Sequence, residues 1–389
     1  MRKPILLLFS FLVSLPMSSQ TPSSEVLKTA QRVNDYFMNK CQDPTRPTFV
    51  NRERPSNLWT RAVYYEGLMA LHVIDPSPRY IDYTDRWANF HHWTPRNGVL
   101  TTDADDQCCA QTYLTRNAQA KDSNPTTNEK IHPTLTNLNH QIATGRHDYW
   151  TWIDAIQMAM PLYFQTYQAT GRREYADYAM QAYRWTRDEC GGGLFNRASG
   201  LWWRDKDFVP PYKETDGNDC YWSRGNGWVY AALVRVMSLL NAQDPYYKEL
   251  KKDYLKMSKA IAACQRADGF WNVSLISPTT YGGKESSGTS LFLYGLSWGV
   301  RNGVLKASIY RSACDKAWMG MAQEAVHQTG FLGYVQGTGK QPGDAQPVTY
   351  DKAPDFEDFG VGCFLLGATE YHHLLETKES MLKKRTEWK

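Results

Sequence analysis

Apolar residues recur at three- and four-residue spacing along most of the chain, the spacing that places them on one face of an α-helix. Clusters of glycine, proline and aspartate, such as Asp75-Pro76 and Asp244-Pro245, separate these periodic segments. The pattern is overwhelmingly helical and predicts an all-α protein. The predicted helices cover residues 24–40, 59–74, 77–93, 105–117, 152–170, 173–187, 225–241, 247–266, 287–302, 308–328 and 359–375.

Several of these helices form pairs in which the first is apolar on all sides and the second is charged on one side. The pairs are 152–170 with 173–187, 225–241 with 247–266, and 287–302 with 308–328. A helix that is apolar all round is buried, so the repeated pairs predict a closed ring of helical hairpins. Long loops separate one pair from the next, and we expect binding residues to gather on them at one face.

The first twenty residues have the features of a secretory signal. Arg2 and Lys3 form a basic start, an apolar run follows over 5–15, and Ser18-Ser19 provides small residues for cleavage. The apolar run is too short to span a bilayer. No low-complexity linker divides the remainder. We therefore expect an exported, periplasmic protein with one catalytic domain over residues 21–389.

The charge of the chain excludes some partners. The formal net charge is +4, and removal of Arg2 and Lys3 with the signal lowers it by two, to +2. With no basic cluster, nucleic-acid binding is not expected. The eight cysteines show no CxxC spacing, and apolar neighbours favour buried free thiols for Cys264 and Cys363. The histidines include no HExxH, and His372-His373 is interpreted as surface, so no metal and no cofactor is expected.

Two aromatic segments carry the candidate chemistry. The first, DYWTWIDAIQMAMP, places Asp154 at the start of a helix, and the second, YWSRGNGW, places Arg224 in a glycine-rich turn. Aromatic residues make up 13% of the chain, which suggests stacking surfaces beyond ordinary core packing. A carboxyl group beside tryptophan rings, with a guanidinium that binds an anion, suggests chemistry on an acidic sugar. The alternative is that both segments are only the packed ends of core helices.

An ordered set of motifs resembles the unsaturated rhamnogalacturonyl and glucuronyl hydrolases. The motifs extend over roughly residues 59–375 and are WIDAIQMAMP, GLWWRDKD, WSRGNGW, DGFWNVSL, ESSGTSLFLYGL and FGVGCFLLG. The resemblance implies a six-hairpin (α/α)6 barrel that acts on the oligosaccharides left by polysaccharide lyases. It also implies the reaction: a terminal 4,5-unsaturated uronic acid is protonated at carbon 4, and water adds at carbon 5. The resulting hemiketal opens and expels the rest of the saccharide.

A single carboxyl group that donates a proton and returns as a base is sufficient for this reaction. The resemblance implies that Asp154 is this group. Aromatic neighbours would raise its pKa, whereas the helix N-terminus would lower it. Helix capping is the alternative role, although Thr151 can serve as the cap instead. For a second carboxylate the resemblance favours Asp106, with Asp105 open and capping an equal alternative for both.

The resemblance also implies a set of substrate-binding residues. Arg224 is expected to bind the uronate carboxylate through its planar fork of donors. For the tryptophans, core packing is an equal alternative to stacking on sugar, and helix capping is an alternative for the hydroxyl residues. The glycines around Asn226 allow either close approach to a ligand or tight helix packing. The remaining candidates are Trp228, Asn226, Trp222, Trp59, Trp152, Ser287 and Thr289.

One position departs from the family pattern. Arg204 stands in GLWWRDKD where relatives of this family carry a histidine. Arginine cannot exchange protons near neutral pH, so we expect Arg204 to bind an anionic or hydroxyl-rich part of the substrate. The departure weakens the case for a pectin-derived rhamnogalacturonan disaccharide. It leaves room for another unsaturated uronate, such as one from a glucuronate-containing glycan.

Three other functions remain open on the sequence. A sugar epimerase on the same barrel would require histidines as acid and base, and the predicted helix starts supply carboxylates and arginine instead. A non-catalytic glycan-binding protein would have no need of Asp154. A conventional glycosidase with two carboxylates is the nearest enzymatic alternative. The expected partner is an oligosaccharide that ends in an unsaturated uronate.

Overall fold

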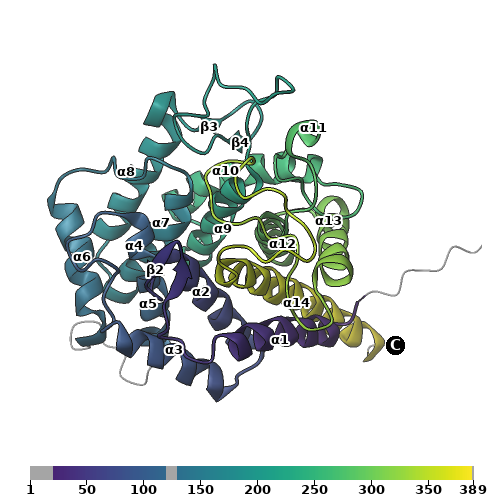
Figure 1. The fold of residues 1–389 in the computed structure, drawn as a ribbon, viewed down its shortest axis with the longest axis horizontal. Coiled ribbons are helices and arrows are strands. Elements are labelled where there is room, and N and C mark those ends of the chain that lie inside the picture. The colour runs from purple at the N-terminus through teal and green to yellow at the C-terminus, as the bar shows by residue number, and fades with distance from the viewer. Residues whose placement is uncertain (1–20, 120–128, 388–389) are drawn as a thin grey trace, which may run out of the picture.

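The computed structural model describes residues 21–119 and 129–387, so the predicted signal over 1–20 lies outside the described residues. Helices dominate, and six of the described ones form an inner ring (Figure 1). Each inner helix contacts the next along the chain, and the last contacts the first, which closes the ring. These helices are α2 (Trp59–Ile74), α5 (Cys109–Gln119), α7 (Asp154–Thr170), α9 (Ser223–Leu239), α12 (Ser286–Arg301) and α14 (Asp358–Glu387).

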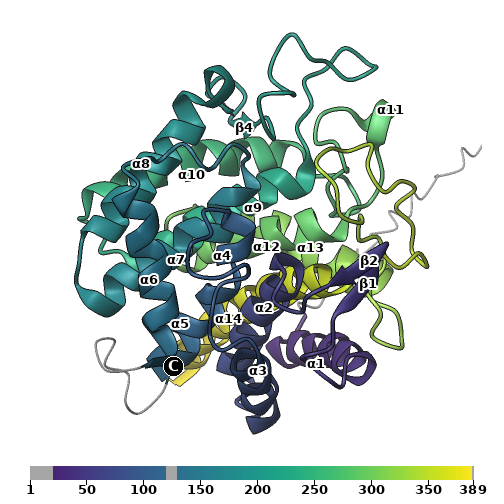
Figure 2. The same ribbon diagram turned by 60° about the vertical axis from the view of Figure 1, so that its left-hand side comes forward.

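A second set of helices surrounds this ring. In Figures 1 and 2, α3, α8, α10 and α13 lie outside the inner helices that precede them, and α1 lies outside α14. The arrangement confirms the predicted all-α barrel of six hairpins. The outer helices are α1 (Ser23–Lys40), α3 (Pro78–Phe90), α6 (His132–Ala143), α8 (Glu174–Asp188), α10 (Pro245–Ala263) and α13 (Ala307–Gly320).

Burial follows the predicted difference between inner and outer helices. In α9 every residue from Ser223 to Val234 is buried, as expected for a helix packed on all sides. In α10 burial is confined to one face, including Leu250, Tyr254, Met257 and Ile261 at helical spacing. No helix among the described residues is both long and apolar enough to cross a membrane.

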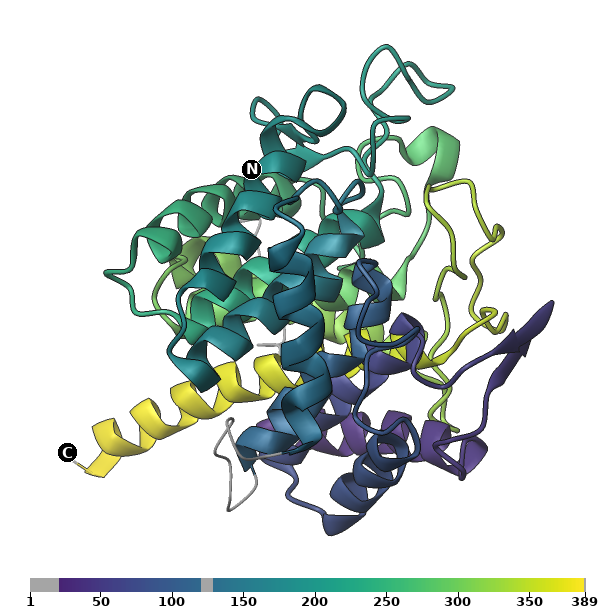
Figure 3. The same cartoon turned by 90° about the vertical axis from the view of Figure 1, so that its left-hand side faces the viewer.

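Some elements differ from the prediction. The helix expected over 105–117 is interrupted at Cys108 and begins as the separate short helix α4 (Ala104–Gln107), and the helix expected over 308–328 ends in a π-helical turn, Met321–Ala325. Helix α14 runs beyond residue 375 to Glu387, and its last turns extend past the barrel (Figure 3). The sequence did not predict α6, because its buried face is polar: Gln107 Nε2 donates to Asn137 Oδ1 at 2.9 Å.

The remaining elements are short. Two antiparallel hairpins, β1 (Thr48–Val50) with β2 (Arg52–Arg54) and β3 (Phe195–Asn196) with β4 (Leu201–Trp202), lie in the loops, together with helix α11 (Pro278–Tyr281). All eight cysteines are free thiols; Cys363 is buried as expected, whereas Cys264 is only partly buried. The loops before α7, α9 and α14 bring Trp152, Arg204 and Thr338 to the N-terminal ends of the inner helices.

Candidate active site

A pocket of about 170 Å³ opens at the N-terminal ends of the inner helices. The starts of four helices, α2, α4, α7 and α9, and two loops contribute to its wall. The lining residues are Trp59, Asp105, Trp152, Asp154, Met158, Arg204, Trp222, Arg224, Thr338 and Gly339.

Asp154 is the first residue of α7, and its side chain is turned into the pocket. The residue is only 8% exposed, and burial raises the pKa of its carboxyl group against the opposing charges of Arg204 and Arg224. Ile153 occupies the N-cap position without a side-chain cap, so the predicted capping role of Thr151 is wrong. Asp154 thus lies in the pocket as predicted, beside two arginines.

Asp105, not Asp106, is the second carboxyl group of the pocket. Asp103 caps α4 by accepting from the Asp105 amide at 2.9 Å, which leaves the Asp105 side chain on the pocket wall. Burial raises the pKa of Asp105 to about 8, and the charges of Asp103 and Asp154 add to this rise. Asp105 is therefore protonated at neutral pH and lies close enough to Asp154 for their charges to interact.

The prediction of Asp106 as the second catalytic carboxylate is wrong, because its carboxylate is occupied by contacts outside the pocket. Its carboxylate forms an ion pair with Arg96 and accepts from Asn97 Nδ2 at 2.9 Å and from Thr101 Oγ1 at 2.6 Å. These partners belong to the loop before α4, and Asp106 is only 2% exposed. Successive residues of a helix point about 100° apart, so Asp105 and Asp106 face different surroundings. Asp106 anchors the loop and takes no part in the pocket.

Arg224 lines the pocket, but its fork of donors is largely occupied. Nη1 donates to the carbonyl of Gln336 at 2.6 Å, and Nη2 donates to the carbonyl of Gly337 at 2.7 Å. The guanidinium is fully buried and lies 4.5 Å from the centre of the Trp222 ring. A bidentate contact with a substrate carboxylate would compete with both carbonyls. The structure therefore gives Arg224 a second role, which is to hold the loop that carries Thr338.

Arg204 is the more accessible arginine of the pocket. Its Nε donates to Asp154 Oδ2 at 3.2 Å and its Nη1 donates to Asp205 Oδ2 at 2.8 Å. The guanidinium lies 6.0 Å from the centre of the Trp152 ring, and 21% of the side chain is exposed. This position fits the expectation that Arg204 binds an anionic part of the substrate.

Three of the predicted tryptophans line the pocket, whereas four other predicted residues lie in the core. Trp59, Trp152 and Trp222 are in the wall, and Trp228 instead packs edge-on against Trp59 with ring centres 6.1 Å apart.

The three polar candidates lie in the core. Asn226 is buried and forms hydrogen bonds with the backbone of Trp202 and Trp222. The contacts of the other two are equally internal: Ser287 Oγ donates to Glu285 at 2.6 Å, and Thr289 Oγ1 accepts from the Trp271 amide at 3.1 Å.

The glycines beside Asn226 serve helix packing. A methyl group at Gly225 would lie 3.0 Å from the Trp222 ring, and one at Gly227 would lie 3.0 Å from the side chain of Leu291. The sequence did not predict Met158, Thr338 or Gly339 as pocket residues. Thr338 and Gly339 belong to an irregular loop that has no hydrophobic periodicity, so the sequence gives no signal for them.

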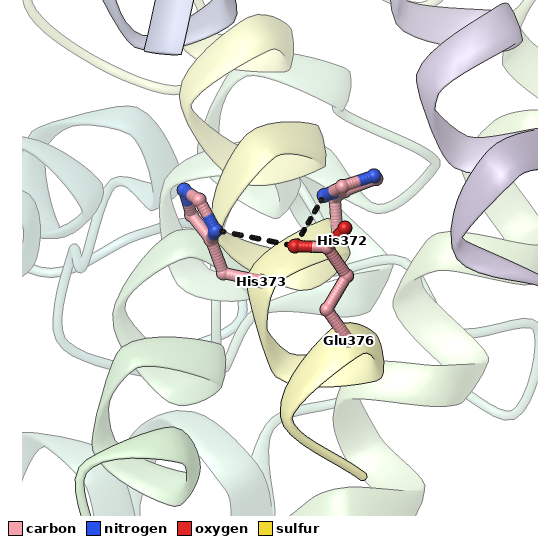
Figure 4. A group of neighbouring side chains, drawn as sticks. All are labelled: His372, His373 and Glu376. Carbon is pink, nitrogen blue, oxygen red and sulfur yellow. Dashed lines mark ion pairs between the residues drawn. The ribbon is translucent and has the colours of Figure 1, made fainter. Parts of the chain in front are cut away.

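A second group of titratable side chains lies on α14 (Figure 4). Glu376 Oε2 is 3.7 Å from His372 Nδ1 and 3.9 Å from His373 Nδ1, a grouping that could hold a metal ion. His372 is buried, contrary to the predicted surface position. Burial and the charge of Arg301 lower the pKa of His373, and the same charge disfavours a bound cation. At about 1.5 Å per residue the group is roughly 20 Å along the helix from Phe359, which packs beside Arg224 near the pocket.

Comparison with known proteins agrees with this geometry. The family described as Glycosyl Hydrolase Family 88 matches residues 29–375, most of the chain. The chain belongs to glycosyl hydrolase family 88. The solved structure of a glycosyl hydrolase family 88 protein from Bacteroides vulgatus has a TM-score of 0.81 with this family 88 chain at 31% identity, and covers 91% of this chain and 100% of that one.

Two curated relatives of this family 88 enzyme carry the name Unsaturated 3S-rhamnoglycuronyl hydrolase. The one from Formosa agariphila is 29% identical over 336 residues, which cover 82% of this chain and 85% of the relative. The one from Alteromonas sp. (strain LOR) is 31% identical over 388 residues, which cover 92% and 89%. The predicted family and the prediction of a glycoside hydrolase are confirmed, which sets aside the epimerase and the non-catalytic alternatives.

Proposed function

We propose that the enzyme removes a 4,5-unsaturated uronic acid from the non-reducing end of an oligosaccharide produced by a polysaccharide lyase. The carrying observation is the pair Asp105 and Asp154, two carboxyl groups with raised pKa values in one small pocket that also holds Arg204. Hydration of an enol ether requires a carboxyl group that holds a proton in the substrate complex, and burial in this pocket favours the protonated form of both groups.

Asp154 is assigned the role of acid and then base. Its carboxyl proton goes to carbon 4 of the sugar, and the carboxylate takes a proton from the water that adds at carbon 5. The hemiketal then opens, and the remaining saccharide leaves as a free alcohol. Asp105 lies beside Asp154 as a neutral carboxyl group, because its pKa is about 8. A neutral neighbour avoids a second negative charge next to the carboxylate that develops during the reaction.

Arginine and aromatic residues are assigned the binding of the sugar. Arg204 presents a partly exposed guanidinium toward the pocket and is the proposed partner of the uronate carboxylate. The half-buried rings of Trp59 and Trp152 offer faces on which a sugar ring can stack, and Trp222 closes the wall behind Arg224.

The relatives support a narrower substrate. Both curated relatives are named for unsaturated 3S-rhamnoglycuronyl substrates, and the presence of Arg204 had already weakened the case for a pectin-derived disaccharide. We therefore assign an unsaturated rhamnoglycuronyl oligosaccharide as the preferred substrate class, ahead of other unsaturated uronides.

A spectroscopic assay tests the function. The enol ether conjugated with the carboxylate absorbs at about 235 nm, and hydration removes this absorbance, whereas hydrolysis of a saturated glycoside has no such signal. Incubation with lyase products of several polysaccharides should abolish the absorbance, most rapidly for rhamnoglycuronyl products. Release of saturated sugars without any loss of absorbance would favour the conventional glycosidase instead.

Export completes the proposal. The basic, apolar and small-residue pattern of residues 1–20 supports cleavage near Gln20 or Thr21 and a periplasmic location, where lyase products would be met. N-terminal sequencing of the native protein should give a mature chain that starts there. A native protein that retains Met1 would rule out this part of the proposal.

A further inference from the structure

The side chain of Arg204 donates hydrogen bonds to two carboxylates, one inside the pocket and one beside it in the chain. Arg204 lies two residues after the end of β4 and bridges Asp154, in the pocket, and Asp205, its own neighbour in the chain. Among the three side chains the guanidinium is the most accessible, 21% exposed against 11% for Asp154 and 10% for Asp205. Its Nη2 has no hydrogen-bond partner in the part of the chain that the structure describes. An anion that enters the pocket can therefore reach Arg204 without displacing Asp205.

The charges around Asp154 come from three segments. Asp105 faces it from α4, Arg204 and Asp205 from the loop after β4, and Arg224 from the start of α9. Arg224 is further balanced by Glu285, a buried residue that caps α12. Arg224 also donates to the carbonyls of two loop residues, so it is fixed in place. Arg204, whose side chain donates hydrogen bonds to two carboxylates and to no backbone carbonyl among the described residues, is the cation that a new anion can share.

We propose that uronate binding draws Arg204 away from Asp154 and thereby leaves Asp154 protonated for catalysis. The inference rests on the proposed function. In the free enzyme the guanidinium stabilises the Asp154 carboxylate. When the sugar carboxylate takes the Nε and Nη2 donors, Asp154 loses its counter-ion and binds one proton from solvent. That proton goes to carbon 4, water returns one to Asp154, and product release restores the ion pair and frees the proton taken up.

The protonation of Asp154 supports this sequence. Burial raises the pKa of its carboxyl group, and Arg204 is the first of the groups that oppose the rise. Without Arg204 as partner, Arg224 and the backbone amide of Asp154 are left to favour the charged form of this buried carboxyl group, and Arg224 is held by the loop carbonyls. An opposite charge within hydrogen-bond distance lowers an Asp pKa by roughly 1–3 pH units, so withdrawal of Arg204 raises the pKa of Asp154 further and favours its protonated form.

Under this proposal Asp154 becomes protonated only when the bound ligand carries a carboxylate. A neutral sugar that fills the pocket leaves Arg204 on Asp154, so the acid stays ionised and no proton is delivered. A uronate both binds and produces the acid form. The enzyme would therefore select uronates in the catalytic step and not only in binding.

Kinetics with an unsaturated uronyl disaccharide provide the first test. The rate falls as pH rises through the pKa of the essential acid, and kcat/KM reports the free enzyme whereas kcat reports the complex. The alkaline limb of kcat/KM should lie below that of kcat by roughly 1–3 pH units in the wild type. In R204Q the limb of kcat/KM should move up to that of kcat, whereas R204K, which keeps the charge, should retain much of the separation. Coincident limbs in the wild type, or limbs that R204Q does not move, would overturn the coupling.

Calorimetry identifies the group that takes the proton. Saturated D-glucuronate, which has no enol ether to hydrate, is titrated at roughly pH 6 in buffers of different ionisation enthalpy. The wild type should take up as much as about one proton per ligand bound, and D154N should bind with none. Binding without proton uptake, or uptake that persists in D154N, would contradict the proposal. An enzyme that does not turn over unsaturated uronides at all would instead refute the proposed function.

Discussion

At the scale of single residues, the pocket depends on which of two adjacent carboxyl groups it receives. Asp105 and Asp106 are neighbours in the sequence, yet one lines the pocket and the other anchors a loop through Arg96 and Thr101. The motif locates the pair but cannot distinguish its members, because the start of α4 depends on the Asp103 cap. A shift of one residue in that start would exchange their roles.

Matched substitutions separate the two residues. Asp105→Asn should lose turnover by roughly 10²-fold or more with a folded protein, because the amide stays neutral but cannot exchange a proton with Asp154 as the protonated carboxyl group can. Asp106→Asn should instead lose stability by about 2 kcal/mol, because Arg96 keeps its buried end without a counter-charge. Turnover and denaturant unfolding of both variants give the comparison. A stable, inactive Asp106 variant beside an active Asp105 variant would reverse the assignment.

The raised pKa of Asp105 also predicts a dependence of stability on pH. Its pKa is about 8 in the folded protein, above the ordinary value of 3.8, so the folded state keeps a proton that the unfolded state loses. Stability from this group is complete below the ordinary value and declines as pH rises through about 8. The melting temperature of Asp105→Asn relative to wild type should therefore rise between these two pH values. A difference that stays constant across this range would show that Asp105 is ionised in the folded enzyme.

At the scale of elements, the helices were predictable and the loops were not. Repeating apolar positions locate α2, α7, α9 and α12 almost to the residue, because burial on all sides leaves a strong pattern. Helix α6 was missed because polar residues such as Asn137 and Gln141 form its buried face. The loop that carries Thr338 was missed because hydrogen bonds, and not periodic packing, fix its shape.

Arg224 connects that loop to α9, which gives a prediction at this scale. Arg224→Lys keeps a charge but loses one of the two bonds to the Gln336 and Gly337 carbonyls. Turnover should fall, and amide hydrogen exchange over residues 333–345 should become faster while exchange in α9 stays unchanged. Reduced turnover with unchanged exchange in the loop would assign Arg224 to substrate contact alone.

At the scale of the whole molecule, the pocket exists because the ring closes. Its wall joins helix starts that are far apart in the sequence, and closure brings α14 against α2. Gly67 of α2 and Gly362 of α14 meet at this crossing, where a methyl group on either would overlap backbone of the other helix. Hairpin repetition in the sequence indicates a ring, but the number of hairpins came from the family resemblance, because no local pattern records which helices meet.

Closure can be weakened at a single position. Gly67→Ala has to push α2 away from α14, so we expect a loss of about 1–3 kcal/mol or more in the free energy of unfolding. Gly295→Ala is the comparison. Its methyl group would meet the side-chain ring of Tyr230 on the neighbouring helix α9, and not the backbone of another helix. Denaturant melts measure both. An unchanged midpoint for Gly67→Ala would mean that the crossing is not closely packed.

The central claim is that a buried pocket acid, Asp154, hydrates an unsaturated uronide. Its direct test is turnover of an unsaturated uronyl disaccharide by Asp154→Asn, measured as the loss of enol-ether absorbance. A thermal melt of the same preparation is recorded beside it. Asparagine keeps the volume and costs the start of α7 about 1 kcal/mol or less, so the melt should stay near wild type. Turnover should fall by roughly 10²–10⁴-fold or more, because the proton donor is gone. A variant that melts normally and retains near-native turnover would contradict the account.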